Sequence, residues 1–175
     1  MSDITLVLRA ASFAAHKHRD QRRKDQLASP YINHPLALAS ILAEAGGVTD
    51  AMTLCAALLH DTVEDTETTE QEIAEAFGVE IASIVMEVTD DKRLEKAARK
   101  QAQIDHAATI SNRAKLVKLA DKISNVRDIA FSPPANWPIE RKREYFDWAK
   151  AVVDQLRGIN SVLEQVFDRA YLDRP

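Results

Sequence analysis

Residues 51–60 of the chain read AMTLCAALLH and are apolar on nearly every side when they are drawn as a helix. A helix without a polar face is stable only when other elements pack around it. Thr49 or Asp50, directly before this stretch, can cap its first turn with a side-chain oxygen. The rest of the chain must therefore surround one central helix, which predicts a multi-helix globule rather than a simple bundle.

The composition predicts that the surrounding elements are helical as well. Ala, Leu, Glu, Lys and Arg dominate, only 4 of the 175 residues are Gly, and we find no convincing strand-like alternation of apolar and polar residues. A hydrophobic share of 46% is enough for a core and argues against global disorder. We expect an all-α fold in which residues 1–175 form a single domain.

Residues that start and stop helices divide the chain into segments. Asp3 can cap the first helix, Pro35 suits the first position of the second, and Thr69 with Glu72 makes a capping box. The sequence SPPANWP, which starts at residue 132, is a clear break before a long final helix. The expected helices cover residues 3–18, 35–46, 51–60, 70–77, 80–88, 94–108, 112–130 and 138 onward, with an interruption near Gly158.

Several classes of protein are disfavoured. No apolar run approaches the ~20 residues that span a bilayer, and the N-terminus lacks the basic start of a signal peptide, so we expect a cytoplasmic protein with no membrane partner. The single Cys55 cannot form an internal disulfide and is expected to be a packing residue. The net charge of −4 argues against a nucleic-acid partner.

One short stretch has the opposite charge. Residues 16–24 read HKHRDQRRK and contain five Lys or Arg and one Asp. A local basic patch on an acidic protein suits a small polyanion better than a long phosphate backbone. A solvated loop is the alternative explanation, and charge alone does not separate the two.

His60 and Asp61 stand at the end of the most apolar helix in the chain. Burying a charge there is costly unless another charge compensates for it, and an adjacent histidine and aspartate can converge on one cation. An HD dipeptide is nevertheless common by chance, and a histidine at a helix C-terminus also complements the helix dipole. The pair becomes a candidate metal site only if further ligands exist.

Two further residues can supply such ligands. His34 opens the preceding helix. Asp121 lies in the helix LVKLADKISNVRDIA, on a polar stripe with Asn125 and Asp128. The opposite, apolar face of that helix contains Leu119, Ile123, Val126 and Ala130. The polar stripe is either the solvated side of the helix or the wall of a cleft.

The candidate ligands are His34, His60, Asp61 and Asp121. A mixed set of nitrogen and oxygen ligands suits Mn²⁺, Fe²⁺ or Zn²⁺ better than Ca²⁺. A bound ion can lower the pKa of a coordinated water and polarise a phosphoryl oxygen. Glu64 and Asp65 follow within one turn and are candidates for acid/base or water-positioning groups. Alternatively, they are the acidic approach to the helix that Thr69 caps.

Four motifs, in the order in which they occur, resemble the HD superfamily: YINHP (31–35), LLHDTVEDT (58–66), EVTDDK (87–92) and KLVKLADKISNVRD (115–128). Within that superfamily the sequence resembles the hydrolase domain of the RelA/SpoT homologues, in particular the small, stand-alone alarmone hydrolases of the metazoan type. The likeness runs from about Ala10 to Glu164. Its specific part is HDTVEDT with RRKD and YINHP upstream and LADKxxNxRD downstream.

The resemblance implies an all-α HD-domain fold and manganese-dependent hydrolysis of guanosine 3′-diphosphate 5′-di- or triphosphate to pyrophosphate and GDP or GTP. It assigns the metal to the four candidate ligands and the catalytic role to Glu64 and Asp65. It implies that Arg23 flanks the base and that Lys24 lies near the base or a phosphate. The other residues expected to contact the ribose and phosphates are Lys92, Lys96, Asn125, Arg141 and Tyr145.

Three other functions remain open from the sequence. They are removal of the 2′-phosphate of NADPH, nucleotide binding without catalysis, and hydrolysis of nucleoside 5′-monophosphates by a generic HD nucleotidase. The Arg23-Lys24 pair and Asn125 disfavour the last of these. The native metal, the oligomeric state and the division of roles between the two carboxylates are open as well. Trp137 and Trp148 belong either to the core or to an interface, and we expect them in the core.

Overall fold

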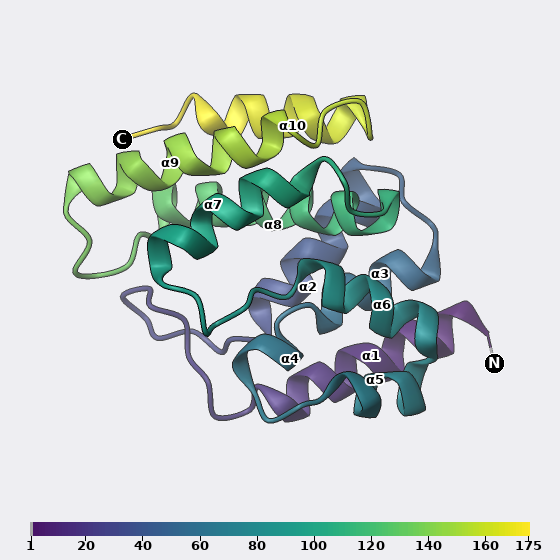
Figure 1. Ribbon diagram of the computed structural model, residues 1–175. Helices are drawn as coiled ribbons and strands as arrows, with labels where there is room; N and C mark the ends of the chain where they lie inside the picture. Colours follow the sequence, from purple (N-terminus) through teal and green to yellow (C-terminus); the bar gives the residue numbers. More distant parts are fainter. Residues whose placement is uncertain (1) are drawn as a thin grey trace.

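The computed structural model describes residues 2–175, and over that range it is helical, as expected (Figure 1). The sole β-type pairing among these residues is an isolated antiparallel bridge between Arg22 and Pro30. The helices are α1 (Asp3–Lys17), α2 (Asn33–Ser40), the π-helix η1 (Ile41–Ala45), α3 (Ala51–Leu59), α4 (Thr62–Asp65), α5 (Glu70–Phe77), α6 (Val79–Val88), α7 (Lys96–Ala107), α8 (Asn112–Phe131), α9 (Ile139–Asp154) and α10 (Ser161–Tyr171).

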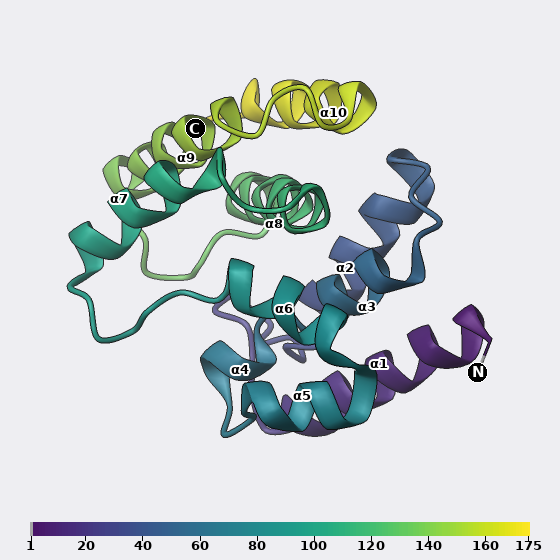
Figure 2. The same ribbon diagram turned by 45° about the vertical axis from the view of Figure 1, so that its right-hand side comes forward.

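Two helices, α3 and α8, hold the fold together. Helix α3 packs against α1, α2, α6 and α8, while α8 also packs against α9 and α10. In Figures 1 and 2, α1 and α5 lie at one end of the molecule and α9 and α10 at the other, with α2, α3, α6 and α8 between them. Helix α7 packs on α9 and is joined to α6 by an extended connection over residues 89–95 (Figure 2).

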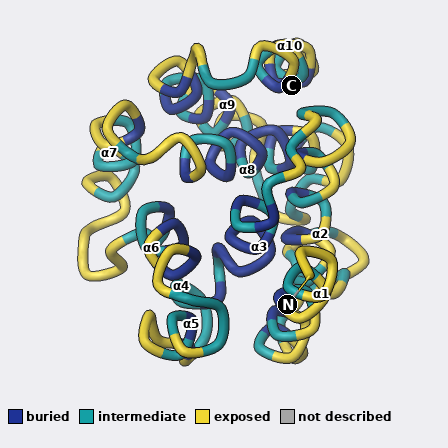
Figure 3. The backbone as a smooth tube through the Cα atoms, turned by 90° about the vertical axis from the view of Figure 1, so that its right-hand side faces the viewer, coloured by how far each residue is buried: buried dark blue, intermediate teal, exposed yellow. Residues whose placement is uncertain are grey.

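The prediction of a central, buried α3 is confirmed. Most of its residues are inaccessible to solvent, including Leu59 and Cys55, and Figure 3 shows the helix as a largely buried tube. Each fully buried leucine of this kind stabilises the fold by about 1.5–3 kcal/mol. Cys55 is a packing residue, as expected. Among the described residues, no helix is long and apolar enough to cross a membrane.

The helices begin and end near the predicted residues, but three details of the predicted helix starts are wrong. Asp50 and Thr69 cap α3 and α5 as expected, through backbone N–H groups three residues on. The first helix is capped by Ser2, not Asp3, because the Ser2 hydroxyl is the group that accepts from the Thr5 N–H. Pro35 is the third residue of α2, because the turn at residues 31–33 already begins the helix.

The third correction concerns the capping box. Glu72 does not bond back to the cap, because its carboxylate pairs with Lys17 of α1 instead. The polar run after His60 contains the short helix α4, which the sequence pattern did not indicate. The expected interruptions are confirmed at residues 132–138 and at Gly158, whose positive φ of 93° separates α9 from α10.

We expect the cap of α10 to contribute measurably to stability. The Asn160 side-chain oxygen accepts from the N–H groups of Val162 and Leu163, and its amide donates to the Gly46 carbonyl at 2.9 Å. Asn160→Ala should therefore lower the free energy of unfolding by about 1–2 kcal/mol, measured by urea denaturation. Asn160→Asp retains the capping oxygen and should lose less. An Asn160→Ala protein as stable as wild type would contradict this assignment.

Candidate metal centre and active site

A pocket of about 420 Å³ opens between α8 and the turn that follows α3, with α7 and α9 on its other sides. A volume of this order fits a small organic ligand. Of the residues that the sequence and the family resemblance singled out, the structure brings all but one to the wall of this pocket. They are Arg23, Lys24, His34, His60, Asp61, Glu64, Asp65, Lys96, Asp121, Asn125, Arg141 and Tyr145. The exception, Lys92, lies beside it and pairs with Asp65.

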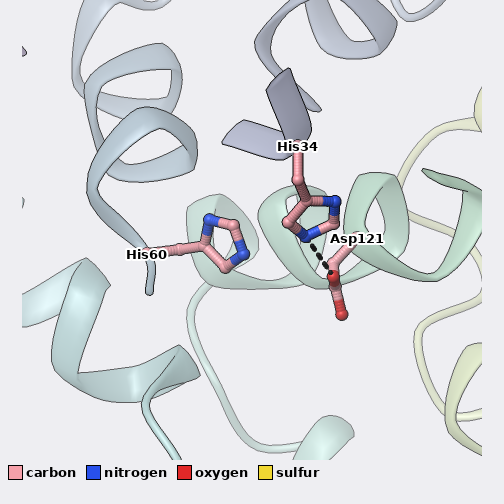
Figure 4. A group of neighbouring side chains, drawn as sticks. All are labelled: His34, His60 and Asp121. Carbon is pink, nitrogen blue, oxygen red and sulfur yellow. Dashed lines mark ion pairs between the residues drawn. The ribbon is translucent and has the colours of Figure 1, made fainter. Parts of the chain in front are cut away.

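Three side chains from three helical segments converge inside the pocket. His34 comes from the first turn of α2, His60 from the end of α3, and Asp121 from the middle of α8. One ligand atom from each lies within 4.8 Å of the other two, and His34 Nε2 is 3.2 Å from Asp121 Oδ1 (Figure 4). The two histidines are almost completely buried. A group of this geometry can hold a metal ion.

Asp61 brings a second carboxylate to the same place. Its Oδ2 atom lies 3.0 Å from His60 Nε2 and 3.8 Å from His34 Nε2. Asp61 precedes α4, and its side chain turns inward because the chain changes direction between α3 and α4. The four residues predicted as ligands are thus close together in the folded protein.

The donor atoms of the two histidines fit a divalent cation. His60 Nδ1 faces the Ala57 carbonyl at 2.8 Å, so the proton of a neutral ring resides there and Nε2 presents a lone pair. His60 Nε2 is buried and has no hydrogen-bond partner, because its approach to Asp61 lacks hydrogen-bond geometry. His34 Nδ1 lies 3.3 Å from the Ser124 hydroxyl, which leaves its Nε2 facing Asp121. Such outer contacts are typical of metal-binding histidines.

The charges of this cluster are strongly coupled. Burial lowers the pKa of His60, but the adjacent Asp61 carboxylate outweighs it and raises that pKa to about 9. Burial raises the pKa of Asp61, yet the imidazoles of His60 and His34 hold it well below its usual range. The carboxylates thus attract positive charge to the cluster. A cation bound there would replace the proton on His60, so protons and metal ions should compete.

Asp121 is held in place from two sides. Lys122 Nζ donates to Oδ2 at 2.9 Å, and Asn125 Nδ2 donates to Oδ1 at 2.5 Å. Burial raises the pKa of Asp121, but the charge of Lys122 outweighs it and holds the pKa well below 3.8. Lys122 is itself buried, with its ammonium group 4.3 Å from the centre of the Trp148 ring. Asp121 therefore stays ionised and fixed in orientation.

Glu64 and Asp65 lie on α4 next to this cluster and have different surroundings. The Glu64 Oε2 atom accepts the N–H of Asp90 at 3.0 Å, and burial raises the Glu64 pKa to about 7. Asp65 forms an ion pair with Lys92, and its backbone carbonyl accepts from Gln21 at 2.6 Å. At neutral pH, Glu64 can hold or release a proton, whereas Asp65 is paired with a cation.

The outer part of the pocket is cationic and aromatic. Arg23 is anchored by Asp128 at 2.5 Å, and the Arg141 guanidinium lies 4.1 Å from the centre of the Trp137 ring. Trp137 and Trp148 were expected in the core. Both are only partly buried, because each packs against the core and also lines the pocket.

Sequence reasoning missed several residues of this site. Tyr31 donates its hydroxyl to Asp61, and the buried Lys118 and Lys122 line the pocket from α8. Tyr31 stands in the motif YINHP, three positions before His34. Its place in the same motif as a candidate metal ligand is the signal that could have identified it from the sequence. The two lysines look like solvated residues in a single sequence, because only tertiary packing buries them. Lys118 Nζ donates to the Val88 carbonyl at the end of α6, and Lys122 lies beside the Trp148 ring of α9.

Comparison with known proteins finds an HD domain over residues 10–147. The chain is 55% identical over 173 residues to a Xenopus tropicalis protein named guanosine-3′,5′-bis(diphosphate) 3′-pyrophosphohydrolase MESH1. The aligned region covers 99% of this chain and 97% of that protein. The human protein of the same name is 50% identical over 173 residues, with the same coverage. A solved structure described as a metazoan ortholog of SpoT that hydrolyses ppGpp superimposes with a TM-score of 0.94, at 47% identity, over 97% of this chain and 95% of that one.

The raised pKa of Glu64 predicts a pH-dependent cost to folding. The unfolded chain releases this proton near pH 4.5 and the folded protein near pH 7, so the stability of the metal-stripped protein falls between these values as the pH rises. Glu64→Gln removes the charge and should stabilise the metal-stripped protein by on the order of 1–3 kcal/mol at pH 8, with little gain at pH 5. Urea denaturation at both pH values measures this difference.

The matched control is Glu67→Gln, which changes an exposed glutamate two residues after Asp65. It should show no comparable gain at pH 8. Equal behaviour of the two variants across the pH range would show that burial of Glu64 has no energetic consequence.

Proposed function

Because the chain belongs to the HD domain family, in the group of small metazoan-type hydrolases related to RelA/SpoT, we propose that it is a metal-dependent 3′-pyrophosphohydrolase of guanosine 3′,5′-bis(diphosphate). The observation that carries the proposal is the convergence of two histidines and two aspartates beside a carboxylate pair, inside one pocket whose wall also contains Lys and Arg side chains. We further propose that residues 1–175 act as a single HD-type domain. The packing of α10 on α8, beyond the matched segment, supports this view.

The proposed ligands are His34, His60, Asp61 and Asp121, and the proposed ion is Mn²⁺, with Zn²⁺ or Fe²⁺ as alternatives. The mixed nitrogen and oxygen donors and the absence of thiolates from the pocket lining favour these metals over Ca²⁺. When bound, such an ion supplies a Lewis acid for the phosphoryl oxygens and lowers the pKa of water.

The reaction joins a water oxygen to the phosphorus that carries the 3′ oxygen, and breaks the bond between that phosphorus and the 3′ oxygen. Asp65 is suited to orient the water, since Gln21 and Lys92 hold it in one position. Glu64, with a pKa of about 7, is suited to hold the proton that the leaving 3′ oxygen requires. The products are pyrophosphate and GDP or GTP.

The nucleotide would be held by the outer wall of the pocket. Arg23 presents a flat guanidinium for stacking on the base, with Lys24 next to it, and Asp128 keeps Arg23 in one orientation. Lys92, Lys96 and Arg141 supply positive charge for the phosphates. Asn125 and Tyr145 offer hydrogen bonds toward the ribose. The cationic side chains of the pocket would also stabilise the charge that develops on the phosphoryl oxygens.

Product analysis tests this proposal directly. Purified protein loaded with Mn²⁺ should release pyrophosphate from guanosine 3′,5′-bis(diphosphate), and Asp61→Ala should lose at least ~10²-fold in rate because it lacks a ligand. Chromatography of the nucleotide products and a pyrophosphate assay provide the readout. NADPH, tested in parallel for phosphate release, covers the alternative substrate. An alarmone left intact by the wild-type protein, or full activity of Asp61→Ala, would overturn the proposal.

A further inference from the structure

The hydroxyl group of Tyr31 lies between the two aspartates that begin and end the turn 61–65. It donates to Asp61 Oδ2 at 2.5 Å and lies 3.4 Å from Asp65 Oδ2. One aspartate belongs to the proposed metal site and the other to the proposed catalytic pair. The hydroxyl hydrogen of Tyr31 can therefore fix the positions of the two carboxylates relative to each other.

The Tyr31 ring is fixed from behind by His18. The two ring centres are 4.8 Å apart, and the His18 side chain is 1% exposed, so the tyrosine cannot withdraw from the pocket in that direction. The backbone N–H of Tyr31 also donates to the Gln21 carbonyl at 3.2 Å. These contacts hold the hydroxyl in place without any help from a ligand.

Gln21 connects the same histidine to Asp65. Its Nε2 donates to the Asp65 backbone carbonyl at 2.6 Å, and its Oε1 lies 2.6 Å from His18 Nδ1. Because the amide nitrogen is the donor to Asp65, the amide oxygen must accept, and His18 Nδ1 must carry the proton. Once the Gln21 amide nitrogen is the donor to Asp65, the direction of both hydrogen bonds, from His18 to Gln21 and from Gln21 to Asp65, is determined.

We propose that Tyr31, Gln21 and His18 are positioning residues, a brace that sets the two aspartates for metal binding and catalysis. The proposal rests on the proposed function: its first half on the proposed metal ligands and its second half on the proposed reaction. Tyr31 acts on Asp61 and thereby on metal affinity, whereas Gln21 acts on Asp65 and thereby on the rate of the chemical step. Contacts behind a metal ligand typically change metal affinity or activity by ~10–100-fold.

The brace also connects the basic loop to the catalytic turn. Gln21 and Tyr31 stand at the two ends of the loop that contains Arg23 and Lys24, and the bridge between Arg22 and Pro30 closes that loop. The proposed nucleotide contacts and the two aspartates therefore share one frame. A shift of Tyr31 should move the Asp61 carboxylate, and a shift of Gln21 should move Asp65, while Lys96 on α7 and Arg141 on α9 stay in place.

The test compares Tyr31→Phe with Tyr171→Phe. Both substitutions delete one tyrosine hydroxyl that donates to an aspartate, but Tyr171 bonds Asp147 at 3.0 Å outside the pocket. Manganese affinity is measured calorimetrically on metal-stripped protein without substrate. Tyr31→Phe should weaken Mn²⁺ binding by ~10-fold or more, and Tyr171→Phe should not change it. Thermal unfolding of the metal-stripped variants should stay within about 4 °C of wild type.

Gln21→Leu is a second, independent test variant, and it tests the proposal by itself if Tyr31→Phe does not fold. It should lower kcat for pyrophosphate release by ~10-fold with KM and Mn²⁺ affinity close to wild type, a separation that general destabilisation would not produce. Wild-type Mn²⁺ affinity in Tyr31→Phe, or unchanged kcat in Gln21→Leu, would overturn the brace. The metal measurement uses no nucleotide and is therefore independent of the substrate. If Tyr31→Phe binds Mn²⁺ more weakly but the wild-type protein leaves the alarmone intact, the proposed substrate is refuted and the positioning role of Tyr31 still stands.

Discussion

Helix α3 has no polar face, so the fold must enclose it, and His60, the residue directly after its last turn, lies in the interior. Helices α1, α2, α6 and α8 surround α3, and two of them, α2 and α8, carry His34 and Asp121 of the candidate metal centre. The site is therefore built against the central core. This origin gives the ligands fixed positions, since a displacement of His34 or Asp121 would require the core to repack.

Burial at this place has an electrostatic consequence. Asp61 and Asp121 lie in a region where an uncompensated carboxylate would be costly, and the protein compensates with Lys122, with the two imidazoles, and with the hydroxyl of Tyr31. A divalent cation would complete this balance more effectively than the proton on His60. The same burial that makes the cluster a candidate metal centre also raises the pKa of Glu64, so one structural cause accounts for both parts of the proposed chemistry.

The sequence predicted the features that depend on residue type and local periodicity. The all-α class, the buried α3 and the closeness of His34, His60, Asp61 and Asp121 belong to this group. Features that depend on tertiary packing were missed or misplaced. Helix α4 is too short to show periodicity, and the buried lysines of α8 look like solvated residues until the end of α6 and Trp148 of α9 pack against them. The tryptophans were assigned to the core because a sequence cannot reveal that a tryptophan packed against the core also lines a pocket.

The central claim is that four side chains from three parts of the chain bind one divalent ion. Crystals grown with Mn²⁺ and measured at the manganese absorption edge address it most directly. We expect one strong anomalous peak in contact with the side chains of His34, His60, Asp61 and Asp121, next to Glu64 and Asp65. A peak elsewhere in the pocket, or one that leaves out Asp61 or Asp121, would contradict it.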